Sequence, residues 1–133
     1  MNLARYTHER WAATAELNEL LPEEKVFTGM SGEPAPPYAV ISQEGRKPFS
    51  RHSDGSAIDK MLLRIQVFHG QYDAGLAIVR EINVAFEGGS FDLDDGCKVF
   101  GMLRIDQREK QLAADLWQFI VDFEITAYAP EGV

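Results

Sequence analysis

The side chains that could bind a metal ion cluster in one short acidic segment. Asp92, Asp94 and Asp95 suggest a calcium loop, but such a loop needs a glycine at its sixth position and a glutamate at its twelfth. Counted from Asp92, these positions hold Cys97 and Leu103. The sequence therefore favours a solvated acidic turn, and we predict no metal site.

A second group is His52-Ser53-Asp54, which places the three residue types of a hydrolytic triad in adjacent positions. Catalytic triads are assembled from distant parts of a chain, because neighbouring side chains diverge. Gly55 follows, as in an ordinary loop. The three histidines are scattered without the spacing of metal ligands, and we expect His69, at a strand end, to be exposed or hydrogen-bonded.

The remaining reactive side chain is the single cysteine, Cys97. The acidic residues just before it raise the pKa of a thiol, so we expect an inert and at least half-buried group. The glycines form neither GxGxxG nor GxxxxGK[ST], so no nucleotide-binding motif is present. We therefore predict no catalytic residue and no cofactor.

Composition limits the classes of protein that remain. The chain has 133 residues, of which 45% are hydrophobic and 26% charged, as in one soluble globular domain. The net charge of −8 argues against a sequence-independent binder of duplex DNA, and we expect no sequence-specific contact with nucleic acid. Neither an apolar membrane span nor a secretion signal is present, which predicts a cytoplasmic protein.

Hydrophobic periodicity predicts two helices and five strands. The first helix is expected over about 7–21, with Thr7 as its N-cap, and the second over 71–87, ended by Gly88-Gly89. The expected strands are 25–28, 38–43, 61–69, 97–106 and 116–128. The segments between them are expected to be a loop at 29–37, a long polar loop at 45–60 and a charged connection at 107–115.

These elements predict an α+β fold in the order α-β-β-(long loop)-β-α-β-β. The alternation in the last strand places Phe119, Val121 and Phe123 on one face and Asp122 and Glu124 on the other. A sheet with one covered face is then expected, so we predict a two-layer sandwich in which two helices pack on a mostly antiparallel sheet. The domain spans 1–133, with a core over about 7–128 and a frayed tail at 129–133.

The distribution of charge is uneven along the chain. Residues 1–80 carry ten acids and nine bases, whereas residues 81–133 carry eleven acids and four bases. Segment 45–60 has a net charge of +2 within this acidic background. We interpret it as an arm that is poorly ordered in an isolated subunit and docks on an acidic face of another copy or partner. An ordinary solvated loop is the alternative. The candidate interface residues are Arg46, Lys47, Arg51, His52 and Lys60.

The order of elements and several sequence strings resemble the tail-completion and tail-terminator proteins of long-tailed bacteriophages and prophages. The strings that carry the resemblance are Lys25-Val26-Phe27-Thr28-Gly29, Pro36-Pro37-Tyr38-Ala39-Val40-Ile41, Leu63-Arg64-Ile65-Gln66-Val67-Phe68 and Leu116-Trp117-Gln118-Phe119-Ile120-Val121-Asp122-Phe123. A leading helix and a helix directly after His69-Gly70 complete the pattern. The similarity covers about 10–128. It departs from the pattern at 107–115, where a turn rich in Asp, Gly and Thr is usual.

The resemblance implies a non-enzymatic assembly protein of the virion tail. Such a protein forms a homo-oligomeric ring that caps the tail tube and joins it to the head connector, so its partners are itself, tube protein and connector protein. The resemblance implies no catalytic residues.

Two other functions are compatible with the residues. One is a small ligand-binding or enzymatic domain with a pocket lined by Trp117, Phe119 and Phe123, although an aromatic stripe at strand spacing is usually core. The other is a stand-alone binding module whose acidic C-terminal half meets a basic partner.

Overall fold

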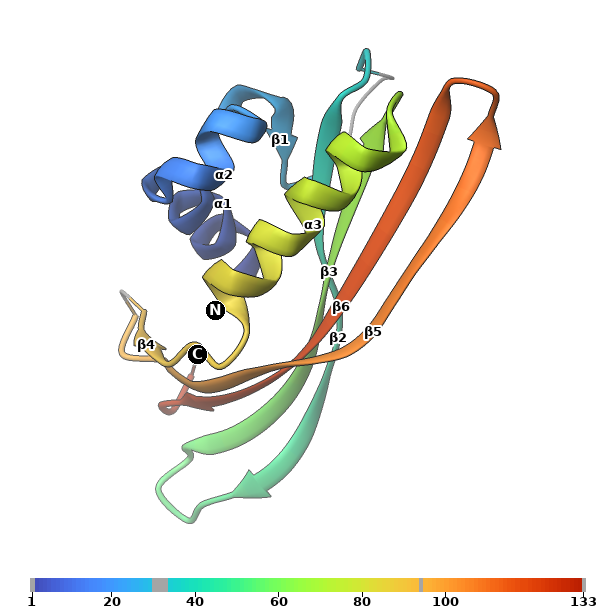
Figure 1. Ribbon diagram of the computed structural model, residues 1–133. Helices are drawn as coiled ribbons and strands as arrows, with labels where there is room; N and C mark the ends of the chain where they lie inside the picture. Colours follow the sequence, from blue (N-terminus) through green and yellow to red (C-terminus); the bar gives the residue numbers. More distant parts are fainter. Residues whose placement is uncertain (1, 30–33, 94, 133) are drawn as a thin grey trace.

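The computed structural model describes residues 2–29, 34–93 and 95–132 of the chain. The fold is mixed α+β, as expected, with a curled six-stranded sheet and three α-helices (Figure 1). The helices gather on one side of the sheet, and the opposite side carries no helix among the described residues. Part of the loop expected at 29–37, and Asp94 of the acidic turn, lie outside the described residues.

The helical region at the N-terminus differs from the single helix expected over 7–21. Helix α1 (Leu3–Ala13) and helix α2 (Ala15–Leu20) are separated at Thr14, whose backbone is extended, and the 3-10 helix η1 (Glu23–Lys25) follows. The Thr14 hydroxyl donates a hydrogen bond of 2.7 Å to the Arg10 carbonyl, which satisfies one of the groups freed by the break. The indole of Trp11 donates to the Leu21 carbonyl at 2.9 Å and fixes the bend.

The N-cap of α1 is Asn2, whose side chain accepts a hydrogen bond from the backbone N–H of Arg5 at 3.0 Å. Thr7, expected at that position, lies inside the helix and is buried. Its hydroxyl donates to the carbonyl of Leu3. The prediction was therefore wrong because the helix begins one turn earlier and its first turn lacks a strong apolar signal.

The sheet has the strand order β1-β2-β3-β6-β5-β4. Only the pair β1–β2 is parallel, and the other neighbours are antiparallel. The strands are β1 (Val26–Phe27), β2 (Tyr38–Arg51), β3 (Ala57–His69), β4 (Phe91–Asp92), β5 (Lys98–Ala113) and β6 (Leu116–Ala129). Compared with the expected order, β4 is additional, and the first helix is divided.

Two long hairpins, β2–β3 and β5–β6, replace the connections expected at 45–60 and 107–115. The polar segment 45–60 is not a loop, because β2 continues to Arg51, β3 begins at Ala57 and the two strands stay paired. Likewise, β5 runs to Ala113 and pairs with β6 almost to the turn. The sequence signal failed mainly because the distal parts of β2 and β5 are exposed on both faces, so they carry no apolar alternation.

The core lies between the helices and one face of the sheet. Strand β6 contributes Phe119, Val121, Phe123 and Ile125, all almost fully buried, as the alternation predicts. Helix α3 (Tyr72–Phe86) covers them, with bounds close to those expected. Ala129, expected in a frayed tail, is instead the last residue of β6 and pairs with Ala57.

Helix α3 approaches the sheet very closely at Gly75. A Cβ atom at this position would lie 2.2 Å from the Phe119 ring, so only glycine fits beside the buried aromatic side chain. Tyr72, one turn earlier, packs its ring against Trp117 and Phe119 with centroids 4.9 and 5.7 Å apart. The aromatic residues that could have lined a ligand pocket therefore pack against α3.

Candidate assembly surface

The five candidate interface residues lie in the hairpin formed by β2 and β3, here called the β2–β3 arm (residues 44–60). The hairpin places them on both faces of the sheet rather than in one cluster. Lys47 is the register partner of Lys60, which in turn pairs with Thr126, so both lysines share the helix-free face. Arg46 and Arg51 lie opposite the core residues Met61 and Ala57, on the other face.

Two of these cations are engaged within the subunit. The Nε atom of Arg46 lies 2.5 Å from Oδ2 of the buried Asp59. The ammonium of Lys60 lies 3.4 Å from a Glu124 carboxylate oxygen and 4.9 Å from the centre of the Phe49 ring. Arg46 supplies the buried Asp59 with the partner that a buried carboxylate requires, whereas the partly exposed pair of Lys60 and Glu124 links β3 to β6.

The other three candidates are exposed. Lys47 and Arg51 make no side-chain hydrogen bond or ion pair with any described residue. His52 closes the turn through its backbone, which donates to the Ser56 carbonyl at 2.9 Å and accepts from Gly55 at 3.1 Å. Gly55 has a φ of +88°, which a residue with a side chain rarely adopts.

Asp54 also stabilises this turn, and its carboxylate is hydrogen-bonded to Ser56 rather than to the ring of His52, as a catalytic triad would require. One of its carboxylate oxygens accepts from the Ser56 backbone at 3.0 Å and from the Ser56 hydroxyl at 2.6 Å. These hydrogen bonds lower the pKa of Asp54. The hydrogen bonds of His52 and Asp54 therefore define the turn that joins β2 to β3. Lys47 and Arg51 precede this turn and lie on the paired backbone of β2.

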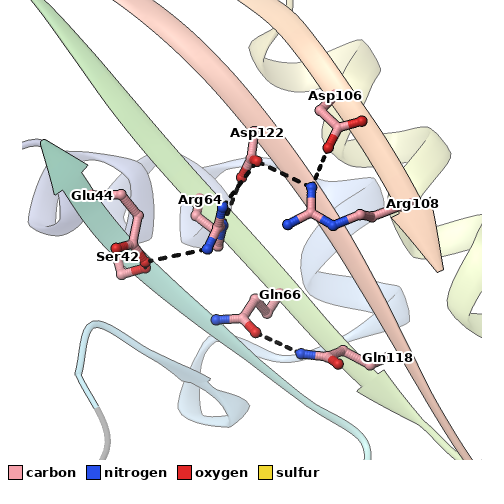
Figure 2. Close-up of polar contacts among 8 residues, drawn as sticks. All are labelled: Ser42, Glu44, Arg64, Gln66, Asp106, Arg108, Gln118 and Asp122. Carbon is pink, nitrogen blue, oxygen red and sulfur yellow. Dashed lines mark hydrogen bonds and ion pairs between the residues drawn. The ribbon is translucent and has the colours of Figure 1, made fainter. Parts of the chain in front are cut away.

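A chain of charged side chains crosses the helix-free face from β2 to β5 (Figure 2). At its centre is Asp122 on β6, which is only 5% exposed. Its carboxylate accepts two hydrogen bonds from Arg64 of β3, at 2.8 and 3.2 Å, and lies 3.4 Å from a guanidinium nitrogen of Arg108 of β5. Glu44 lies 3.9 Å from Arg64, and Asp106 pairs with Arg108.

The electrostatics of this network favour the ionised carboxylate. Burial opposes the charge on Asp122, but the hydrogen bonds and positive charge of Arg64, with a further contribution from Arg108, outweigh it and lower the pKa of Asp122. Hydrogen bonding to Asp122 correspondingly raises the pKa of Arg64. The network therefore fixes the register of four strands on the face that no described helix covers.

The second hairpin is called the β5–β6 arm (residues 103–118), and the sequence predicted its strands only up to Asp106 and from Leu116. Its polar side chains contact helix α3. Tyr72 donates to a Glu109 carboxylate oxygen at 2.6 Å, and the Asn83 amide donates to Gln107 at 3.0 Å. Arg104 donates to the same Gln107 oxygen. The charged residues at 104, 106 and 108 continue the alternation of the predicted strand 97–106 and could have indicated that it extends beyond Asp106.

Both outer strands have long unpaired edges within the described chain. Strand β1 pairs with β2 only at Ala39 and Val40, and β4 pairs with β5 at Lys98 and Val99. The remaining edges are interrupted by bulges, two in β2 and three in β5, and β2 also contains Pro48. Bulges, proline and charged side chains oppose the addition of another strand. A second molecule is thus expected to contact these edges through side chains rather than by pairing with the strand backbone.

The exposed acidic surface nearest the N-terminus lies on α2 and η1. Segment 16–24 carries four carboxylates and no base, and all four are exposed. None of them makes a side-chain hydrogen bond or ion pair with a described residue. This segment is called the acidic helix end, and its carboxylates are Glu16, Glu19, Glu23 and Glu24.

The remaining candidates from the sequence, Cys97, the histidines and the acidic turn, show no arrangement for catalysis or metal binding among the described residues. Cys97 is buried, and burial together with Asp95 raises the pKa of its thiol to about 11. The His69 ring accepts a hydrogen bond from the Gln71 backbone at 3.0 Å, and burial lowers its pKa. Across residues 2–29, 34–93 and 95–132, no three His, Cys, Asp or Glu side chains are placed to hold a metal ion. No described helix is long and apolar enough to cross a membrane.

The chain and its fold resemble those of known proteins. The Tail completion protein gp17 family matches residues 8–128 of the chain. The chain therefore belongs to this family of phage tail-completion proteins, as its sequence pattern suggests. No curated protein matches the chain.

Among solved structures, a protein in the virion of a native gene transfer agent particle has the same fold. The TM-score is 0.76 at 14% sequence identity, and the match covers 96% of each chain. At this identity the similarity establishes the fold alone.

Proposed function

We propose that this protein is a non-enzymatic tail-completion protein that forms a homo-oligomeric ring at the end of the phage tail tube. In this role the ring caps the tube and joins it to the head connector. The observation that carries the proposal is membership of the tail-completion family over residues 8–128. The similar fold of a chain in a gene transfer agent virion supports it, because that protein too is part of a particle.

The surface described above is suited to such a role. The two arms extend in opposite directions from a single core, and they present charged side chains on ordered strands (Figure 1). A subunit with different surfaces at its two ends makes head-to-tail contacts, which close into a ring when the rotation between neighbours allows it. The whole chain acts as one domain in this proposal, with Lys47, Arg51 and His52 of the β2–β3 arm at the contact between subunits. It assembles in the cytoplasm and remains in the virion tail.

The experiment that tests this function uses tail tubes assembled without the protein. Purified wild-type chain is added, and electron microscopy with gold-labelled protein records where it binds. We expect labelling at one end of each tube and recovery of joining to heads. Labelling along the sides of the tube, or unchanged head joining, would contradict the proposal.

A further inference from the structure

We propose that the β2–β3 arm of one subunit docks, through Lys47 and Arg51, on the acidic helix end (residues 16–24) of a second copy of this chain. This inference rests on the proposed homo-oligomeric ring and specifies the contact that builds it. The first argument is charge. The two cations and the four carboxylates of opposite sign are all exposed and unpaired among the described residues.

The second argument is that each element carries neighbouring like charges, and that Lys47 and Arg51, which project from opposite faces of β2, flank the outer edge of this strand. Lys47 stands directly opposite Lys60 across the β2–β3 pair, where like charges repel, and the partly exposed ion pair of Lys60 with Glu124 offsets only part of this repulsion. Glu16 and Glu19 lie one helical turn apart on α2, where like charges also repel. Contact with the opposite surface would relieve both repulsions at once.

The third argument is the placement of the two surfaces. Helix α2 and the tip of the β2–β3 arm lie at opposite ends of the molecule (Figure 1), so they cannot meet within one subunit. A contact between them joins the end of one copy to the other end of the next. Such contacts are heterologous and generate a ring when the rotation between neighbours closes.

The bulged edges add a reason to assign the contact to side chains. Pro48 and the bulge between Pro48 and Ser50 flank the segment that carries Lys47 and Arg51. Continuous strand pairing at this edge is therefore opposed. Exposed cations on an ordered strand can instead meet the end of a short helix without any change in the fold of either subunit.

Charge reversal tests the contact directly. One variant carries Lys47→Glu with Arg51→Glu, and another carries Glu16→Lys with Glu19→Lys. We expect each to weaken self-association by about tenfold or more at roughly 50 mM salt, measured by sedimentation velocity alone and on tail-tube ends. Mixing the two variants should restore association, because each reversed surface then finds a complementary one.

Two controls separate a specific contact from a change in net charge. A chain that carries all four reversals has the wild-type net charge of −8 and should associate with itself as the wild type does. The pair Arg80→Glu and Lys98→Glu changes the charge as much as the arm variant, on α3 and β5, and should leave association unchanged.

Zero-length cross-linking identifies the touching residues. Isotopically light and heavy chains are mixed, and a carbodiimide couples amines to carboxylates in contact. The expected product joins Lys47 of one isotope to a peptide containing residues 16–24 of the other.

Three results would overturn the inference, and they are distinguishable. If wild-type rings form but neither reversal weakens them, or if mixing fails to restore association, this contact is wrong and the proposed function stands. If the rings cross-link Lys47 only to other segments, the arm docks elsewhere. If the wild type does not associate with itself even on tail tubes, both the ring and this contact fail.

Discussion

The two hairpin arms have similar architecture and use their charged residues differently. Each consists of an outer strand with an exposed distal half and an inner strand that belongs to the centre of the sheet. In the β5–β6 arm, Glu109 and Gln107 are hydrogen-bonded to α3, and Arg108 is paired with carboxylates of the sheet. In the β2–β3 arm, Lys47 and Arg51 point outward and pair with no described residue.

The difference indicates which charges stabilise the subunit and which remain available to another molecule. A charged residue with an internal partner is largely satisfied within the fold, whereas exposed like charges favour a complementary surface. On this basis the β5–β6 arm, where only the cation of Lys110 is exposed without a described partner, is mainly part of the subunit's own structure. The β2–β3 arm, which has two such cations, is the better candidate for assembly. The following substitutions test the common core first, then the parts that distinguish the arms.

The largest effect is expected at Val121, which is fully buried in the strand shared by both halves of the sheet. Val121→Asp should destabilise the protein by about 4 kcal/mol or more, because it buries an unpaired charge. Val84→Asp is the matched control, since Val84 is 74% exposed on α3 and should change stability by only about 0.5 kcal/mol. Urea unfolding measures both, and a stable Val121→Asp variant would mean that the core face of β6 is wrongly assigned.

Gly75 tests how α3 is seated on the sheet and on the β5–β6 arm. Gly75→Ala places a methyl group against the buried ring of Phe119 and should cost about 3 kcal/mol through overpacking. Gly101→Ala is the control, because a Cβ atom there meets nothing within 4 Å. Equal unfolding midpoints for the two variants would show that α3 can shift without loss.

Asp122 tests the network that links the two halves of the sheet. Asp122→Asn should reduce stability by about 2 kcal/mol near neutral pH, because it weakens the hydrogen bonds to Arg64 and Arg108 and leaves these arginines only their more exposed partners, Glu44 and Asp106. Glu124→Gln, in a more exposed pair with Lys60, should cost much less.

The same variant has a defined dependence on pH. The pKa of Asp122 is lowered in the folded state, so its contribution is fully present above the ordinary carboxyl pKa of about 3.9 and is lost as the pH falls from that value through the lower pKa of the folded state. The stability difference between wild type and Asp122→Asn should therefore shrink when urea unfolding is repeated at about pH 3. A constant difference at both pH values would exclude the ionised carboxylate as the source of the stabilisation.

The smallest effect is expected from Tyr72→Phe, which removes the hydrogen bond to Glu109. Amide hydrogen exchange should become faster in the β5–β6 arm and stay unchanged in the β2–β3 arm, because this hydrogen bond connects only the β5–β6 arm to α3. Tyr128→Phe, on the helix-free face of β6, should change neither. Equal acceleration in both arms would contradict the separation of their roles.

The sequence predicts the parts of this fold that have a strong apolar period. Helix α3 and strand β6 lie close to their predicted bounds, because one face of each is almost continuously buried. The distal halves of β2 and β5 could not be predicted in this way, since their side chains alternate between two exposed faces. The two-residue strand β4 is too short to produce any periodic signal.

The sequence could predict which segment carries the candidate interface residues, but not how their side chains are arranged in the structure. A net positive segment is visible in the sequence, and all five of its candidate residues do lie in the β2–β3 arm. That Arg46 and Lys60 have internal partners, whereas Lys47 and Arg51 have none among the described residues, depends on strand register. The Arg64–Asp122 pair likewise arises from β3 and β6 lying side by side, 58 positions apart in the sequence.

The most direct test of the account is a cryo-electron microscopy reconstruction of tail tubes completed with the wild-type protein. We predict a closed ring of identical subunits at one end of the tube, with the β2–β3 arm of each subunit against helix α2 of its neighbour. A tube end that carries a single copy, or no copy, would contradict the central claim that the protein completes the tail as a homo-oligomeric ring.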